Sequence, residues 1–226
     1  MTDREADFGV AWRAAPEAVR RSLNLAYRAL AAGGLAVGAV LTDAAGTVLC
    51  EGRNEAYEEG PAAPGGGPLR GTPLAHAEMN ALGAARTGWD LGSAVLWSTQ
   101  EPCDMCAAAA RFTRVGEVRY LAPDPWALAE GSAGASGARP AGGAVWLLAA
   151  NAMFLRSVAV ATPGPGEPAI LTHHRAVEPE TAALHDSLPP GLPAAASATE
   201  WLSALWPALI PLAEARARRL PTPRTG

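Results

Sequence analysis

The sequence contains no lysine, and its 18 basic side chains, all of them arginines, stand against 22 acidic ones. The resulting net charge of −4 gives the protein no general cationic surface. Contacts with phosphates dominate the affinity of proteins for nucleic acids, and they require clustered positive charge. We therefore expect no nucleic-acid partner for this chain.

Cysteine and long apolar runs are also scarce. Of the three cysteines, Cys103 and Cys106 form a C-x-x-C pair and leave Cys50 without a disulfide partner, which favours the cytoplasm. The first residues, 1–5, are polar and predict no signal peptide. The longest apolar stretch, 141–155, is too short and too rich in alanine and glycine to span a bilayer, so we expect no membrane partner.

Against this sparse background, two short motifs are prominent. His76 and Glu78 are separated by one alanine, and Pro102-Cys103 is followed three residues later by Cys106. The two motifs supply one imidazole, two thiols and one carboxylate. Zinc takes nitrogen and sulfur ligands tetrahedrally, and a catalytic zinc keeps one of its four positions for water. His76, Cys103 and Cys106 are the three candidate ligands of Zn²⁺, which leaves Glu78 to move protons.

Neither motif is specific when it is taken alone. A C-x-x-C pair also occurs in redox proteins and as half of a structural zinc site. A structural site needs a fourth protein ligand, and the chain offers only distant ones: Cys50, His173, His174 and His185. The order of the motifs, with a proline before the first cysteine, favours a catalytic zinc over both alternatives.

The combination H-x-E…P-C-x-x-C is the pattern of zinc-dependent nucleobase deaminases. Residues 38–43, 46–49 and 52–54 also resemble the opening strands of the cytidine/deoxycytidylate deaminase superfamily. Within it, the chain is most similar to the branch of guanine deaminases, cytosine deaminases and tRNA adenosine deaminases. The resemblance covers about residues 16–125, and it implies a homodimer or larger assembly.

The resemblance also implies a reaction. A zinc-bound hydroxide attacks the amine-bearing carbon of a ring, Glu78 transfers protons, and ammonia leaves. Together with the acidic composition, this predicts a cytoplasmic hydrolytic deaminase of a free nucleobase or nucleoside. Two alternatives remain: a tRNA adenosine deaminase, which the basic tail favours, and a non-catalytic zinc-binding scaffold of the same fold. The basic tail consists of Arg216, Arg218, Arg219 and Arg224.

The hydrophobic pattern predicts an α/β architecture. The resemblance implies that it is a three-layer, cytidine-deaminase-like fold with a central mixed sheet flanked by helices. We expect a catalytic domain over 1–160 and a partly helical C-terminal extension over 161–226. The expected helices are 16–32, 73–86, 104–113, 145–155 and 199–219, the last kinked or shortened by Pro207 and Pro211. The expected strands are 36–42, 47–52, 95–99, 118–121 and 158–160, and loops are expected at 55–71, 129–143 and 188–198, the last of them a proline-rich linker.

Four residues are candidates for contact with the substrate. In the family, an asparagine at the position of Asn54 binds the base or its sugar, although Asn54 also suits a turn. Trp97 either stacks on the ring or fills the core, and the backbone of Trp97, Ser98 and Thr99 is expected to line the pocket. The loop between Asn54 and His76 is longer than in the branch, through residues 61–68, and is a candidate lid.

Overall fold

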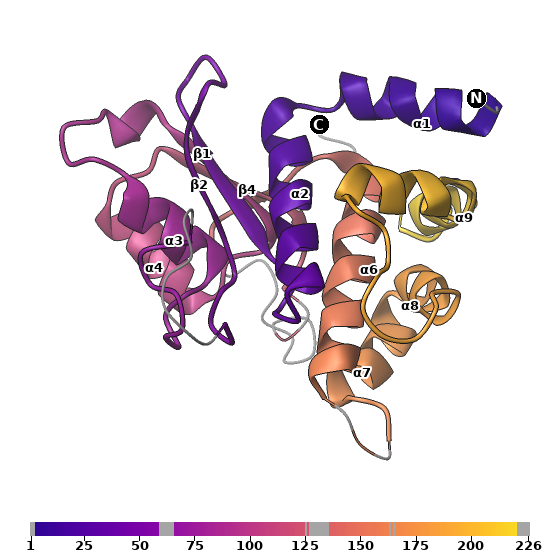
Figure 1. The fold of residues 1–226 in the computed structure, drawn as a ribbon. Helices are drawn as coiled ribbons and strands as arrows, with labels where there is room; N and C mark the ends of the chain where they lie inside the picture. The colour runs from indigo at the N-terminus through magenta and orange to yellow at the C-terminus, as the bar shows by residue number, and fades with distance from the viewer. Residues whose placement is uncertain are drawn as a thin grey trace.

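The computed structural model describes residues 3–58, 66–124, 126, 136–162, 164 and 166–220, and its centre is a five-stranded mixed sheet (Figure 1). The strand order is β2-β1-β3-β4-β5, and β1 pairs antiparallel with both β2 and β3, whereas β3, β4 and β5 are parallel. The strands are β1 (Gly38–Thr42), β2 (Val48–Arg53), β3 (Val95–Gln100), β4 (Glu117–Ala122) and β5 (Arg139–Pro140).

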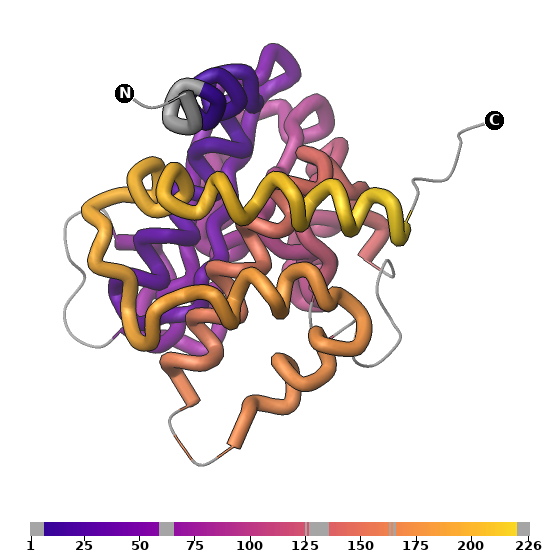
Figure 2. The backbone as a smooth tube through the Cα atoms, turned by 90° about the vertical axis from the view of Figure 1, so that its right-hand side faces the viewer, coloured from indigo at the N-terminus to yellow at the C-terminus, as the bar shows by residue number. Residues whose placement is uncertain are grey.

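Helices cover both faces of this sheet, which confirms the predicted three-layer α/β fold. In Figure 1, α3 (Ala77–Ala84) and α4 (Asp104–Phe112) lie on one side of the strands, and α2 (Glu17–Ala31) and α6 (Gly143–Ala161) lie on the other. A further helical layer packs outside α2 and α6 (Figures 1 and 2). It contains α1 (Asp3–Ala14), α7 (Ala169–Val177), α8 (Pro179–Asp186) and α9 (Ala198–Arg219).

The strand directions bring several connections to one edge of the sheet. Because β1 is antiparallel to both of its neighbours, β2 runs in the same direction as β3, and β4 is parallel to β3. The carboxyl ends of β2, β3 and β4 therefore meet at one edge, together with the start of β1. In α/β proteins, this is the edge where ligands bind.

One glycine sets how closely the layer of α3 approaches the sheet. A Cβ atom added to Gly52 in β2 would lie 2.4 Å from the Ala77 carbonyl oxygen and 2.6 Å from the Ala81 amide nitrogen. These distances are far below van der Waals contact, so no other residue fits there without moving α3. Gly52 thus fixes the distance between the sheet and the helix that begins after His76.

The apolar core has two parts, one on each face of the sheet. The smaller cluster lies between the sheet and α3 and α4, and it includes Leu41, Ala81 and Leu96. The larger cluster joins α2, α6 and α9, and it runs along the chain from Phe8 to Ala213. Residues of the C-terminal extension therefore complete a core that begins near the N-terminus. The predicted domain boundary at 160/161 falls at the last residues of α6.

Helix α6 corrects one prediction. Val158, Ala159 and Val160 were expected to form a strand, but they continue the helix to Ala161. β-Branched residues favour strands only weakly, and burial of an apolar helix face overrides that preference. In the part of the chain that the structure describes, α6 alone is long and apolar enough to cross a membrane, yet 72% of its apolar window is buried inside the protein.

The remaining differences concern short or small elements. Helices α1, α7 and α8 and strand β5 were not predicted, and α3 is shorter than the expected 73–86. β5 lies inside the expected loop 129–143, of which 129–135 falls outside the described residues. Helix α9 continues through Pro207 and Pro211 and is not shortened. The other predicted helices and strands are confirmed to within a few residues at their ends.

Candidate metal centre

The three candidate ligands lie at the N-terminal ends of two helices. His76 is the N-cap residue of α3, Cys103 is the N-cap residue of α4, and Cys106 is in the first turn of α4. The N-terminal end of a helix carries partial positive charge, which stabilises thiolates. Both helices follow connections at the carboxyl edge of the sheet, so the fold brings together residues that are 30 positions apart.

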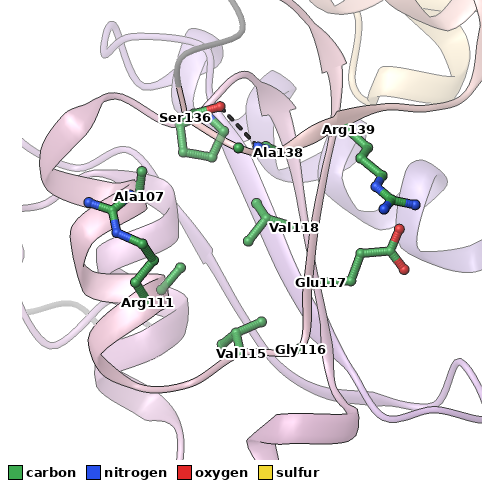
Figure 3. A pocket seen from close by; sticks show the side chains of 12 residues that line it. Ala107, Arg111, Val115, Gly116, Glu117, Val118, Ser136, Ala138 and Arg139 are labelled. Atoms are coloured by element: carbon green, nitrogen blue, oxygen red, sulfur yellow. Dashed lines mark hydrogen bonds between the residues drawn. The ribbon is translucent and has the colours of Figure 1, made fainter.

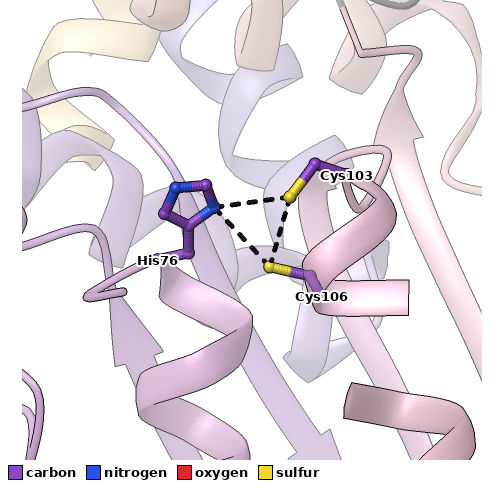
Figure 4. Close-up of side chains that lie close together, drawn as sticks. All are labelled: His76, Cys103 and Cys106. Carbon is purple, nitrogen blue, oxygen red and sulfur yellow. Dashed lines mark hydrogen bonds between the residues drawn. The ribbon is translucent and has the colours of Figure 1, made fainter. Parts of the chain in front are cut away.

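The three ligand atoms form a nearly equilateral triangle (Figure 4). The Nδ1 atom of His76 lies 3.6 Å from the sulfur of Cys103 and 3.6 Å from that of Cys106, and the two sulfurs are 3.7 Å apart. In a tetrahedral site, zinc–sulfur bonds of about 2.3 Å and a zinc–nitrogen bond of about 2.0 Å place two sulfurs about 3.8 Å apart and sulfur and nitrogen about 3.5 Å apart. The triangle therefore fits three corners of a zinc tetrahedron.

The charges in the triangle also suit a cation. The Cys106 thiol and the His76 ring contact the sulfur of Cys103, and these contacts lower the pKa of Cys103 to about 3. The same contacts raise the pKa of the two partners. The pKa of Cys106 is raised because its proton is held by Cys103 and because the thiol is buried, and contact with the Cys103 thiolate raises the pKa of His76. A metal ion takes the place of these shared protons.

Glu78 lies next to the triangle and outside it. Its carboxylate is 3% exposed, accepts a 2.7 Å hydrogen bond from the Ser98 hydroxyl, and contacts the sulfur of Cys106 at 3.5 Å. Burial is the main cause that raises the pKa of Glu78, and the hydrogen bond from Ser98 opposes it. Ser98 therefore orients the carboxylate, a role that the sequence did not indicate when it placed Ser98 in the pocket wall.

The other three candidate substrate contacts lie in different places. Asn54 lines the cavity beside the metal centre, and its Oδ1 accepts a hydrogen bond from the amide of Ala56, as in an Asx turn. The ring of Trp97 packs in the larger core cluster beneath the Arg119 guanidinium, 4.9 Å from the ring centroid, and is not part of the cavity wall. Thr99 is buried and accepts a hydrogen bond from the Gly38 amide.

A cavity of about 240 Å³ opens above His76, Glu78 and Cys103. This volume is below the range of about 300–1,000 Å³ that is usual for pockets holding drug-sized ligands. No arginine is among the described residues that line it. Sequence reasoning missed most of the wall, although the positions after β3 and β4 could have been found from the rule that ligands bind at the carboxyl ends of strands. The missed residues are Leu35, Val37, Gln100, Glu101, Asp124, Trp126 and Phe154.

The loop proposed as a lid is anchored to α3 at both of its described ends. The Asn80 side chain donates to the Arg53 carbonyl and accepts from the Leu69 amide, and the Glu55 carboxylate accepts from the Gly67 amide. Glu55 is also paired with Arg53 at 2.9 Å. Residues 59–65, which include most of the extra length, lie outside the described residues, so the lid stays a prediction.

A second and larger cavity, of about 460 Å³, lies on the other side of α4 (Figure 3). It is bordered by Arg111 of α4, by Glu117 of β4 and by residues 136–139. It contains neither His76 nor Glu78. Size alone therefore does not identify the functional site, and the triangle of ligand atoms does.

The other candidate ligands take no part in the metal centre. Cys50 donates to the Ala81 carbonyl, and burial raises its pKa to about 11. His174 is fully buried in α7, and His185 lies at the end of α8. In the residues that the structure describes, His76, Cys103 and Cys106 form the one cluster of three such side chains that could hold a metal ion.

Comparison with known proteins agrees with this geometry. Residues 13–122 match the family model of the cytidine and deoxycytidylate deaminase zinc-binding region. A tRNA-specific adenosine deaminase from Haemophilus influenzae is 36% identical over 109 residues, and a tRNA(Ile)-lysidine synthase from Deinococcus radiodurans is 35% identical over 117 residues. These matches cover 47% and 50% of this chain but only 57% and 18% of the two relatives.

Solved structures of related proteins match a similar share of the chain. One, from structural studies of A-to-I editing by tRNA:A34 deaminases, is 31% identical, and the match covers 48% of this chain and 77% of the other, with a TM-score of 0.41. The guanine deaminase from Bacillus subtilis is 28% identical over 50% of this chain and 67% of its own, with a TM-score of 0.40. Through residues 13–122, which carry His76, Glu78, Cys103 and Cys106, this chain belongs to the cytidine and deoxycytidylate deaminase superfamily.

Proposed function

We propose that this protein is a zinc-dependent hydrolytic deaminase of a free nucleobase or nucleoside. The observation that carries the proposal is the triangle of His76, Cys103 and Cys106, whose edges of 3.6, 3.6 and 3.7 Å match those of a zinc tetrahedron. Its position at the floor of a cavity, beside a buried carboxylate, favours a catalytic ion over a structural one. A structural zinc would need a fourth protein ligand, and no fourth His or Cys joins the three among the described residues.

The residues of the site divide the chemistry between them. His76, Cys103 and Cys106 would hold the ion, which supplies a Lewis acid that makes water a nucleophile near neutral pH. Glu78 would move one proton of that water to the ring nitrogen and then the second one to the departing amine. Ser98 holds the Glu78 carboxylate in place through its 2.7 Å hydrogen bond. The net reaction converts water and an amine-bearing ring carbon into a ring carbonyl and ammonia.

Size and charge support a small, uncharged substrate. The cavity of about 240 Å³ has no arginine among the described residues of its wall, whereas Glu78, Glu101 and Asp124 bring carboxylates to it. Arg53, at the end of β2, is held by Glu55 and Glu58. A substrate that carries phosphates would find no cationic partner in this wall, which favours a base or nucleoside.

The test measures ammonia release and metal content on the same purified sample. The panel contains guanine, cytosine, adenine and their nucleosides. We expect about one zinc per chain and ammonia from at least one member of the panel. Zinc without ammonia from any free base, nucleoside or tRNA would instead support the second class of function, a non-catalytic zinc-binding scaffold.

The two curated relatives favour a different substrate. Both are named for work on tRNA, one as a tRNA-specific adenosine deaminase, so an adenosine in tRNA is the alternative. The basic tail gives this alternative little support. The Arg216 guanidinium binds Glu178, and that of Arg219 binds Glu180. Arg218 is exposed and lies 3.8 Å from the Glu214 carboxylate.

Filter binding of tRNA at low and moderate salt distinguishes a small-molecule substrate from tRNA. We expect weak binding with little salt dependence and no inosine in the recovered tRNA. Tight binding that weakens steeply with salt, together with inosine formation, would replace the small-molecule proposal with the tRNA one.

We further propose that the protein is a cytoplasmic homodimer. All three cysteines are free thiols, which suits a reducing compartment. Phe112, at the end of α4, is 88% exposed, and a large apolar side chain on a helix that borders the metal centre suits a subunit contact. Light scattering after gel filtration should give twice the mass of the 226-residue chain, and Phe112→Arg should shift it toward the monomer.

A further inference from the structure

Gln100 is the one described residue of the cavity wall whose side chain has both of its polar atoms buried without a partner in the protein. It is 4% exposed, and neither Oε1 nor Nε2 has a hydrogen-bond partner among the described residues. Buried carboxamides are nearly always hydrogen-bonded, and each exception needs a physical cause. A donor and an acceptor left together at the wall of a cavity are typical of a group that binds an occupant.

The position of Gln100 directs it toward the reacting atoms. It is the last residue of β3, two positions after Ser98, and side chains two positions apart in a strand lie on the same face. Ser98 on that face donates to Glu78. Gln100 therefore lines the same cavity as Glu78, the carboxylate proposed to move protons, and Cys103.

A carboxamide offers one donor and one acceptor in a single plane. It pairs with a partner that presents the complementary acceptor and donor side by side, as glutamine does with base edges in DNA. On an amine-bearing base, the matching group is a lactam, a ring N–H beside a ring carbonyl. Guanine carries one as N1–H and C6=O, and free cytosine carries one as N1–H and C2=O. Adenine has no carbonyl, and cytidine has no ring N–H.

We propose that Gln100 is a specificity-determining residue that binds the lactam edge of the substrate base. The Nε2 group donates to the ring carbonyl, and Oε1 accepts from the ring N–H. This inference rests on the proposed deaminase function and narrows it: guanine, guanosine and free cytosine are the favoured substrates, and adenine, adenosine and cytidine are disfavoured.

Asn151 supplies a matched control. It is a second carboxamide with both polar atoms buried and unpartnered among the described residues, but it lies in α6 and is not part of the cavity wall. If an unpaired carboxamide merely lowered stability, Gln100 and Asn151 would respond alike to an apolar substitution. If Gln100 binds the base, only a substitution of Gln100, and not one of Asn151, will change the preference among substrates.

The first experiment compares kcat/KM for the panel in the wild type, Gln100→Met, Gln100→Glu and Asn151→Leu. We expect Gln100→Met to lower kcat/KM for the best lactam base by about 10- to 100-fold and to change that for adenine by less than about 3-fold. Gln100→Glu keeps an acceptor and removes the donor, so it should also lose the preference. Asn151→Leu should keep it, and zinc content should be equal in all four proteins.

The second experiment needs no turnover. Hypoxanthine and purine both lack the leaving amine and differ in the lactam, and their binding can be measured by isothermal titration calorimetry. We expect the wild type to bind hypoxanthine at least about 10-fold more tightly than purine and Gln100→Met to bind the two about equally. If no base releases ammonia, the proposed function fails and this binding ratio still decides the role of Gln100. Equal binding by the wild type, or an unchanged preference in Gln100→Met, would overturn the inference.

Discussion

The α/β layers and the C-terminal helices of this protein are held together by different interactions. Around α3 the contacts are polar and close: Asn80 bridges two segments of chain, Glu78 is fixed by Ser98, and Gly52 allows the helix to touch the sheet. The core contacts of α6 and α9 are apolar, and aromatic rings of Phe8, Trp146 and Trp206 pack at 5.3–5.7 Å.

This difference suggests separate roles: the region around α3 orients the polar groups of the site, and the region around α6 and α9 stabilises the fold. Catalytic groups must be oriented to within fractions of an ångström, which buried hydrogen bonds achieve, whereas apolar packing contributes free energy without fixing polar atoms. The two regions meet at Phe154, a residue of α6 that lines the cavity and packs against Trp126 with ring centroids 5.8 Å apart. Substitutions in the two regions should therefore affect different measurements.

The largest effect is expected from the ligands. Cys103→Ser and Cys106→Ser each remove one of three protein ligands, and structural zinc ions contribute on the order of 10 kcal/mol to their sites. We expect both variants to lose the metal and all measurable deamination. Metal analysis by mass spectrometry checks this, with Cys50→Ser as the control, because Cys50 lies away from the triangle. Full zinc occupancy in both variants would contradict the assignment of Cys103 and Cys106 as metal ligands.

Glu78→Gln should separate catalysis from metal binding. The amide has nearly the same shape but cannot carry the proton, so kcat should fall by about 10²- to 10⁴-fold while zinc stays bound. The thermal midpoint should not decrease, because the substitution replaces a buried carboxylate. Turnover near the wild-type rate would show that this carboxylate has no role in the reaction.

Leu202→Ala should lower stability and leave catalysis and metal binding unchanged. Leu202 in α9 is fully buried in the larger core cluster, and removing such a side chain costs about 2–5 kcal/mol. We expect a lower free energy of unfolding in urea but unchanged kcat and zinc content at temperatures where the variant is folded. A loss of kcat in the folded variant would show that the helical layer also controls the geometry of the site.

Gly52→Ala should disturb the boundary between the sheet and α3. The added Cβ would lie 2.4 Å from the Ala77 carbonyl oxygen, and such overpacking costs about 1–3 kcal/mol. Because α3 must move, we expect weaker zinc binding as well as lower stability. Gly88→Ala is the control, since no described atom lies within 4 Å of its Cβ position, and it should change stability by less than about 0.5 kcal/mol.

The smallest effect is expected from pH. Burial lowers the pKa of His174, so the unfolded state binds a proton at mildly acid pH that the folded state does not. Its contribution is fully present above the unfolded pKa of about 6.5 and is lost as the pH falls below it, with a slope of at most about 1.4 kcal/mol per pH unit. The nearby Glu178 and His173 modulate this shift. The free energy of unfolding, measured in urea between about pH 7.5 and pH 5, should depend less steeply on pH in His174→Leu than in the wild type. This range spans the unfolded pKa. An equal pH dependence in the wild type and in His174→Leu would contradict the assignment of this effect to His174.

Much of the α/β region could be predicted because its signals are local. Gly33-Gly34 marks the end of α2, short apolar runs mark the strands, and each ligand residue directly precedes or opens a helix. The C-terminal helices were harder to predict, since Val158–Val160 suits a strand by composition and a helix by its surroundings. Secondary structure there follows from the core that the helices share with α2, and that core is not visible in a short stretch of sequence.

By itself, the sequence determined the chemistry that this protein can carry. The residue types and spacing of His76, Glu78, Cys103 and Cys106 restrict the site to a few metals and reactions, because ligand chemistry is a property of the side chains. The tertiary structure decided which other residues line the candidate cavity. Trp97 and Gln100 are three positions apart in β3, yet one lies in the core and the other in the cavity wall. The reason is physical: a strand alternates its faces, and only the layers packed on each face determine which one becomes core and which one becomes the site.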